Sequence, residues 1–324
     1  MTQALRRPRR RHALPILLGL LIGSSCVTNR PRLDPVPLSA PTVRIELEPG
    51  GSVVALGLEE YIVGSILAEA DVRGLDEDAA GRVAQVQAIL ARTYALANRS
   101  RHALDGFDLC STTHCQVYRP PDQLSGDGAS LARSAVRATA GLVITYDGLP
   151  INALFHADCG GNTSDASVAW GGQTPLYLQG VGDRFCLLEA PIFWRFEVSS
   201  TDLLAALNHD PRTRVGHRLE SLHTTEEDQA GRVTRVVIRG ADSVSEVRGE
   251  ELRHVLTGRF GANSIRSARF SVERRGNLFV FAGKGWGHGI GLCQRGAASR
   301  ARAGHTPEEI FHHYYHGTWL TQYY

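Results

Sequence analysis

Glu69 lies where an acid can do proton chemistry. Leu58, Ile62, Ile66 and Glu69 are spaced so that they share one face of a helix predicted over Leu58–Ala70. Glu69 therefore prolongs an apolar stripe at the helix end, where partial loss of water would raise its pKa. A carboxylic acid with a raised pKa can protonate a glycosidic oxygen. The spacing alone favours the alternative, a glutamate at a helix end that simply points to water.

A glycine-rich segment, Gly283–Ala297, is the second candidate. Five alternating glycines enclose Trp286 and His288, and Gln294 follows. An apolar run precedes this segment and a helical stretch follows it, which predicts a strand, a turn and a helix. No register gives the G-x-G-x-x-G or G-x-x-x-x-G-K-[ST] patterns of nucleotide loops, so nucleotide binding is set aside. A flexible backbone with an aromatic ring and hydrogen-bonding side chains suits a sugar or a peptide.

Four possible metal ligands lie within fourteen residues: His102, Cys110, His114 and Cys115. Two imidazoles and two thiolates make a tetrahedral zinc set. Their spacing is not that of a standard zinc finger. A Cys110–Cys115 disulfide is the alternative, because disulfides form outside the cytoplasm. Further along, Cys159 and Cys186, each flanked by loop residues, are the expected disulfide pair.

The elements around these residues predict an α+β fold. A second helix is expected over residues 76–99, a hairpin over 142–155, and a last helix opening at Thr306-Pro-Glu-Glu. Residues 42–192 and 266–324 are predicted to form a core of mixed helices and antiparallel strands. Residues 193–265 lack any acid–histidine pattern and are predicted to form a smaller α+β insertion that makes one wall of a cleft.

The N-terminus predicts export. Five arginines, a short apolar run and small residues before Cys26 indicate a signal peptide over residues 1–26. Cys26 is the expected lipidation site, with ordinary cleavage nearby as the alternative, and the Pro-rich residues 27–41 form a tether. Without residues 1–25 the formal charge falls from +2 to −3, which argues against nucleic-acid binding. We expect a protein of the cell envelope (periplasm), lipid-anchored to a membrane.

Three segments together resemble the stage II sporulation protein D family, whose members act on bacterial peptidoglycan. They are Tyr61–Glu69, Gln87–Leu96 and the glycine-rich segment with the residues that follow it. The resemblance implies that Glu69 is catalytic, although Ala70 stands where the family usually has methionine. It also implies that the substrate is bound by a wider set of residues: Arg92, Tyr94, His156, Trp286, His288 and Gln294. The segment around Cys110 resembles one that binds zinc in some members.

The resemblance leaves two functions open. One is a lytic transglycosylase that cleaves the glycan strand with Glu69 as its single acid and base, and the sequence offers no obvious second carboxylate. The other is a non-catalytic peptidoglycan-binding protein that activates a cell-wall amidase. A zinc hydrolase is less suitable, because two cysteines and two histidines leave no open metal position. Catalysis is expected to need no cofactor, and zinc would be structural.

Overall fold

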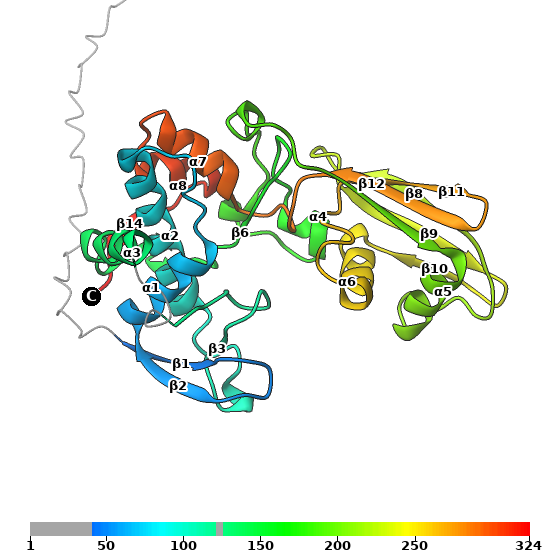
Figure 1. Cartoon of the computed structure of the whole chain (residues 1–324), viewed down its shortest axis with the longest axis horizontal. Coiled ribbons are helices and arrows are strands. Elements are labelled where there is room, and N and C mark those ends of the chain that lie inside the picture. Colours follow the sequence, from blue (N-terminus) through cyan, green and yellow to red (C-terminus); the bar gives the residue numbers. More distant parts are fainter. Residues whose placement is uncertain (1–40, 121–125) are drawn as a thin grey trace, which may run out of the picture. The chain divides into compact units, whose positions relative to one another are not determined.

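The structure, a computed structural model, describes residues 41–120 and 126–324 (Figure 1). It confirms the predicted α+β class, because helices and several antiparallel sheets both contribute to the fold. The predicted signal peptide, Cys26 and nearly all of the tether lie outside the described residues. Within the described ranges, no helix combines the length and apolarity needed to cross a membrane.

Five helices lie together in the helical part of the fold (Figure 1). They are α1 (Leu58–Glu69), α2 (Glu77–Ala97), α3 (Asp127–Ala138), α7 (Gln294–Arg302) and α8 (Pro307–Tyr314). α2 contacts each of the other four. The buried side chains of α1 and α2 include Leu58, Ile62, Ile66 and Leu90, which is the apolar pattern expected from the sequence.

The helix ends follow their capping residues. Asp76 accepts a hydrogen bond from the amide of Ala79 and starts α2. Thr306 and Glu309 form the expected capping box at the start of α8, with Pro307 in the first position. α1 ends at Glu69 because Ala70 adopts an extended conformation, so the last side chain of the helix is the candidate acid.

Short strands frame these helices. One sheet has the order β2 (Val53–Gly57), β1 (Thr42–Glu46), β3 (Leu109–Cys110), and another has β14 (Trp319–Gln322), β4 (Leu142–Tyr146), β5 (Leu149–Pro150). β6 (Phe155–His156) pairs in parallel with β13 (Leu292–Cys293). The second strand of the expected hairpin is thus shorter than predicted, because the pairing of β5 with β4 ends at Pro150 and residues 155–156 pair with the glycine-rich segment.

A separate hydrophobic core forms around two further three-stranded sheets. Their strands are β7 (Phe193–Ser199), β8 (Leu219–Glu227), β9 (Val233–Gly240), β10 (Val244–Val247), β11 (Phe270–Arg275) and β12 (Leu278–Lys284), with α5 (Ser200–His209) and α6 (Gly249–Phe260) against them. β12 pairs with β7 along its whole length, and Phe270, Phe279 and Phe281 are buried in this core. β11 and β12 therefore belong with the inserted part, and not with the core of residues 266–324 predicted from the sequence.

Candidate functional site

Glu69 lines a cavity of about 430 Å³. Its walls come from the end of α1, the face of α2, the glycine-rich segment and the start of α7. The residues that line it include Glu69, Asp71, Arg73, Gln87, Ala157, Glu189, Trp286, Gln294, Arg295 and Arg302. Of the side chains predicted to act together, the structure brings Glu69, Trp286 and Gln294 to one cavity.

Glu69 is half-buried, and one of its carboxylate oxygens is held in place. The amide of Val117 donates a hydrogen bond to Oε1 at 3.0 Å. Within the described residues, Oε2 has no hydrogen-bond partner. Burial raises the pKa of Glu69, although the Val117 amide and the charge of Arg119 act in the opposite direction. The side chain can therefore keep a proton at higher pH than an exposed glutamate and present it from Oε2.

Gln294 joins the glycine-rich segment to the candidate acid. Its Nε2 donates to the backbone carbonyl of Glu69 at 3.1 Å and to Oε1 of Gln87 at 3.3 Å. These contacts fix the first turn of α7 against the end of α1 and the middle of α2. Gln294 thus positions the cavity wall as well as lining it.

Trp286 is the aromatic residue of the cavity. Its side chain is 38% exposed, and the guanidinium of Arg266 lies over the ring at 4.8 Å from its centre. The backbone of Trp286 exchanges two hydrogen bonds with Asp158, so the ring is carried on a fixed backbone. An indole held in this way offers an apolar surface for a sugar ring.

Two other carboxylates line the cavity, and each is paired with an arginine. Asp71 receives hydrogen bonds from Nε and a terminal nitrogen of Arg73, at 2.8 and 2.7 Å, and Arg73 holds the pKa of Asp71 below its usual value. Glu189 forms an ion pair with Arg302. Glu69, by contrast, forms no ion pair in the described part of the chain.

His288 holds the glycine-rich segment in place. Its Nδ1 accepts from the amide of Ile290 and its Nε2 donates to the carbonyl of Phe155, both at 3.0 Å. These two bonds fix a neutral tautomer, and burial lowers the pKa of His288 to about 4. His288 does not line the cavity, so the predicted substrate contact becomes a positioning role.

His156 is buried beside His288, with the ring centres 5.5 Å apart. It lies outside the cavity lining, and its Nδ1 donates to the carbonyl of Ile290 at 3.1 Å. Burial holds the pKa of His156 well below its usual value. A Cβ at Gly287, which has φ +99°, would come within 2.8 Å of the Cβ of His156. The close approach of these two segments thus requires glycine.

Arg92 and Tyr94 were expected at the substrate, and the structure places both in the interior instead. Arg92 is fully buried and makes two hydrogen bonds to the carboxylate of Glu59, at 2.8 and 2.7 Å, and one to the carbonyl of Leu142. Tyr94 is packed in the core with α1. Both predictions were wrong for one reason: the buried face of α2 carries these side chains inward, where Arg92 joins α1 to β4.

The four possible zinc ligands converge. The ligand atoms of His102, Cys110, His114 and Cys115 all lie within 4.8 Å of one another. His102 directs Nε2 toward the sulfur of Cys115 at 3.3 Å, while its Nδ1 is 3.1 Å from a carboxylate oxygen of Asp105. A carboxylate on the far nitrogen of a histidine is the usual outer partner at a zinc site. The donor set fits a structural zinc ion, which stays a prediction, and both cysteines are free thiols here.

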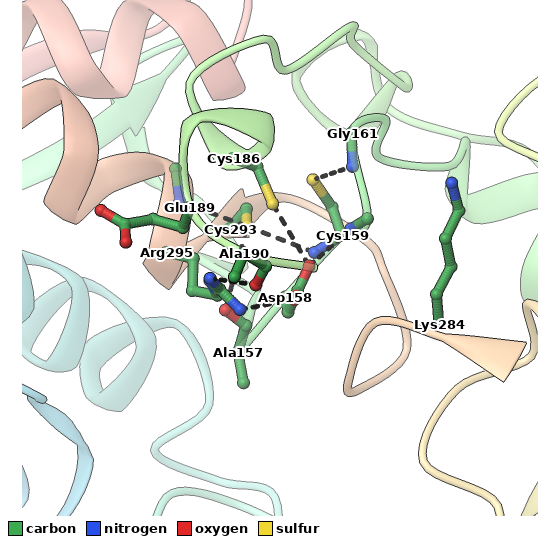
Figure 2. A network of polar contacts seen from close by, with 12 residues as sticks. Ala157, Asp158, Cys159, Gly161, Cys186, Glu189, Ala190, Lys284, Cys293 and Arg295 are labelled. Carbon is green, nitrogen blue, oxygen red and sulfur yellow. Dashed lines mark hydrogen bonds and ion pairs between the residues drawn. The ribbon is translucent and has the colours of Figure 1, made fainter. Parts of the chain in front are cut away.

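Cys159 and Cys186 are neighbours, but they are free thiols and not the expected disulfide. Cys293 lies with them (Figure 2). The carboxylate of Asp183 belongs to the same group. The sequence does not indicate this group of four, because Asp183 and Cys293 come from segments more than a hundred residues apart.

Gln87 is the cavity residue that the sequence could have indicated. It lies one helical turn after Val83, on the inward face of α2, so it is a polar side chain in a buried stripe. Glu69 was found by the same signal on α1. Arg73, Glu189 and Arg302 carry no such signal, because they come from loops or from an exposed helix face.

Comparisons with known proteins agree with this arrangement. The family model for the stage II sporulation protein (SpoIID) matches residues 50–146, which include Glu69 and the His/Cys cluster. Over these residues the chain is similar to the SpoIID family. A second family model, for a domain of unknown function (DUF8618), matches residues 189–291. The second match spans β7 to the glycine-rich segment.

Curated relatives extend the similarity over most of the chain. The stage II sporulation protein D of Bacillus amyloliquefaciens is 28% identical over 310 residues, covering 90% of this chain and 81% of that protein. The protein of the same name from Bacillus subtilis is 27% identical over 297 residues, covering 88% and 80%. An amidase enhancer of Bacillus subtilis is 24% identical over 281 residues, covering 74% of this chain and 38% of that protein. These similarities support a role at the cell wall.

Proposed function

We propose that this protein is a peptidoglycan lytic transglycosylase that cleaves the bond between N-acetylmuramic acid and N-acetylglucosamine, with glycan strands free of stem peptides as its substrate. The observation that carries the proposal is Glu69. It is half-buried, its pKa is raised, and it faces a cavity beside Trp286 and Gln294. The specific reaction goes beyond the cell-wall role that the comparisons support.

Glu69 supplies both proton transfers in this mechanism. Protonated Oε2 donates to the glycosidic oxygen as the bond from that oxygen to C1 of the muramic acid breaks. The resulting carboxylate then takes the proton of the C6 hydroxyl, and O6 bonds to C1. The product is a 1,6-anhydro end, no water is consumed, and Glu69 is returned in its acid form.

The held oxygen of Glu69 makes this alternation workable. Oε1 keeps the hydrogen bond from Val117 in both protonation states, while Oε2 exchanges the proton. That bond stabilises the carboxylate formed halfway through the reaction, and burial favours the acid form that begins it. The two effects oppose each other, so neither the protonated nor the ionised form of Glu69 is strongly favoured.

Trp286 and Gln294 would hold the glycan. The indole offers an apolar surface to a sugar ring, and the amide of Gln294 lies at the backbone of Glu69. Gln87 fixes that amide from the opposite side. Positioning of this kind brings the bond to be cleaved to the acid.

The pairing of the other carboxylates favours a transglycosylase over a hydrolase. A hydrolase of the usual two-carboxylate kind needs a second acid to activate water or to attack the sugar. Asp71 and Glu189 are both engaged by arginines at the cavity. Glu69 is the only one of the three carboxylates at this cavity that lacks an arginine partner in the described part of the chain.

The His/Cys cluster is proposed to hold a structural zinc ion through His102, Cys110, His114 and Cys115. A closed set of four ligands stabilises a fold and leaves no position for substrate. None of these four residues lines the cavity, so the proposed reaction needs no metal.

A second candidate function is the activation of a cell-wall amidase without cleavage of glycan. The similarity to an amidase enhancer favours it, and the same cavity would then bind peptidoglycan only. The raised pKa of Glu69, and its Oε2 without a hydrogen-bond partner among the described residues, favour the first candidate over this one.

Product analysis separates the candidates. Purified protein is incubated with glycan strands stripped of stem peptides, and the fragments are identified by mass spectrometry. We expect fragments that end in 1,6-anhydro-N-acetylmuramic acid. Reducing ends would indicate a hydrolase, and intact strands together with stimulation of an added amidase would indicate the second candidate.

A further inference from the structure

A second cluster of possible metal ligands lies beside the cavity, and the proposed function does not use it. The ligand atoms of Cys159, Asp183, Cys186 and Cys293 all lie within 4.8 Å of one another. All four residues are buried. Cys159 follows β6, Asp183 and Cys186 lie between β6 and β7, where Cys186 begins a 3-10 helix, and Cys293 starts α7. Figure 2 labels the three cysteines.

We propose that this cluster is a second structural zinc site, with three thiolates and one carboxylate oxygen as ligands. Zinc in structural sites takes four ligands in a tetrahedron, and cysteine, histidine and aspartate are its ligands. Zinc–sulfur bonds of about 2.3 Å place two sulfurs of a tetrahedron about 3.8 Å apart. The four ligand atoms are therefore already close to the separation that a zinc ion imposes.

Backbone amides point at the sulfurs as they do around thiolate ligands. The amide of Gly161 lies 3.3 Å from Sγ of Cys159. The amides of Cys159 and Gly296 lie 3.3 and 3.4 Å from Sγ of Cys293. Cys293 also caps the N-terminus of α7, whose free amides favour a negative sulfur. Hydrogen bonds of this kind satisfy the remaining lone pairs of metal-bound thiolates.

Asp183 is held as a ligand carboxylate. The hydroxyl of Tyr314 donates to Oδ2 at 2.6 Å, and the guanidinium of Arg300 lies 3.6 Å from Oδ1. The amide of Cys186 donates to Oδ1 as well, at 3.3 Å. These contacts fix the direction of the carboxylate, which is the usual support for a ligating aspartate.

The charge around the cluster suits a metal. Binding of zinc by three thiols releases three protons and leaves a net charge of −2 on the four ligands with the ion. Arg300 is buried at Asp183, and Arg295 is paired at 3.2 Å with the neighbouring carboxylate of Asp158. Arg232, also buried, donates to the carbonyl of Cys159 at 3.4 Å. The buried guanidiniums of Arg300 and Arg232 thus offset the negative charge of the cluster, and Arg295 offsets that of Asp158.

A disulfide between two of the cysteines accounts for less of the geometry. A disulfide would use two of the sulfurs, and it would give no role to the third thiol or to the Asp183 carboxylate that lie beside it. A disulfide also has little need of the amides that point at Cys159 and Cys293. Zinc engages all four side chains at once.

The site would tie together three segments of the cavity wall. Cys159 is two residues after Ala157, Cys186 is three residues before Glu189, and Cys293 directly precedes Gln294. Ala157, Glu189 and Gln294 all line the cavity. Loss of the ion would therefore loosen the wall opposite Glu69 without removing any residue that touches the substrate.

Metal counting tests the proposal on the full-length exported protein, purified from the envelope without chelators. Three forms are compared: wild type, Cys110→Ser in the first cluster and Cys293→Ser in the second. Cys293→Ser should lose one zinc equivalent relative to wild type, and Cys110→Ser should keep the equivalent held by the second cluster. The measurement on Cys110→Ser leaves the second cluster intact, so it stays informative even where Cys293→Ser fails to fold.

Two results would overturn the proposal. One is an unchanged zinc content in Cys293→Ser, or no zinc in Cys110→Ser. The other is a Cys159–Cys186 disulfide in most of the folded wild-type protein, found by peptide mapping without reduction after the free thiols are alkylated. Replacement of the zinc by cobalt gives a further readout. The Cys110→Ser variant should show thiolate-to-cobalt absorption, and this absorption should be absent from the double variant that also carries Cys293→Ser.

Discussion

Glu69 has its candidate role because α1 ends where it does. The helix buries Leu58, Ile62 and Ile66 and then stops, so the next side chain on that face reaches a cavity instead of the core. Burial raises its pKa, and the Val117 amide keeps one oxygen in place. Loss of water around an acid destabilises its charged form.

This shift makes a prediction about stability. Because the folded pKa of Glu69 lies above its unfolded value, its ionisation costs stability as pH rises through the folded pKa. Glu69→Gln should therefore be at least as stable as wild type at pH 7, and the difference should vanish below about pH 4, where both states bind the proton. Thermal unfolding of both forms across this pH range measures it. A variant clearly less stable than wild type at pH 7 would contradict the raised pKa.

Residue type and spacing indicated Glu69 and Trp286 as candidate site residues, and the structure places both at one cavity. The prediction of substrate contact was wrong for Arg92 and Tyr94, because membership of a motif does not say whether a side chain faces a ligand or the core. The buried face of α2 is mostly apolar, and only the structure shows that Arg92 meets Glu59 there. The pairing of Asp71 with Arg73 at the cavity was likewise invisible, since it depends on how the chain turns after α1.

At the level of elements, the glycine-rich segment is fixed by His288 and Gln294. His288 bonds the carbonyl of Phe155 and the amide of Ile290, and so joins β6 to the residues before β13. Gln294 then joins the start of α7 to α1 and α2. The predicted order of strand, turn and helix is confirmed. Its partners could not be predicted, because they are distant in the sequence.

His288→Ala tests this positioning role. It leaves two backbone groups without partners, which typically costs about 1–3 kcal/mol for each buried group. We expect lower stability in urea unfolding and a higher KM, because Trp286 and Gln294 lose their support. With a pKa of about 4, His288 stays neutral between pH 5 and 8 and should add no titration to the rate in that range. Exposed His312→Ala is the matched control, and equal effects of the two variants would argue against the role.

On the scale of the whole molecule, the described residues divide between the helical part with the cavity and the β-rich part around the second core. The second core begins with β7 at Phe193, the residue at which the sequence predicted the insertion to start. Its far boundary was misplaced, because β11 and β12 resemble core strands in sequence and only their pairing with β7 assigns them. Zinc and lipid remain predictions at this scale.

Anchoring is tested by Cys26→Ser, which removes the only thiol at the expected lipidation position. The basic head, the apolar run and the small residues before Cys26 predict that lipid holds the protein to a membrane. The variant should move from the membrane fraction to the soluble fraction of the envelope. If wild type and variant partition alike, Cys26 does not anchor the protein.

The most direct measurement of the central claim is the rate of glycan cleavage by Glu69→Gln. Glutamine keeps the shape of the side chain and can still accept the Val117 hydrogen bond, but it cannot donate an acid proton. Exposed Glu60→Gln on the same helix is the matched control. General acid–base groups contribute about 10²–10⁴-fold, so Glu69→Gln should lose at least that factor in the release of 1,6-anhydro ends while still binding glycan, and Glu60→Gln should retain the wild-type rate. Cleavage by Glu69→Gln at the wild-type rate would contradict the account.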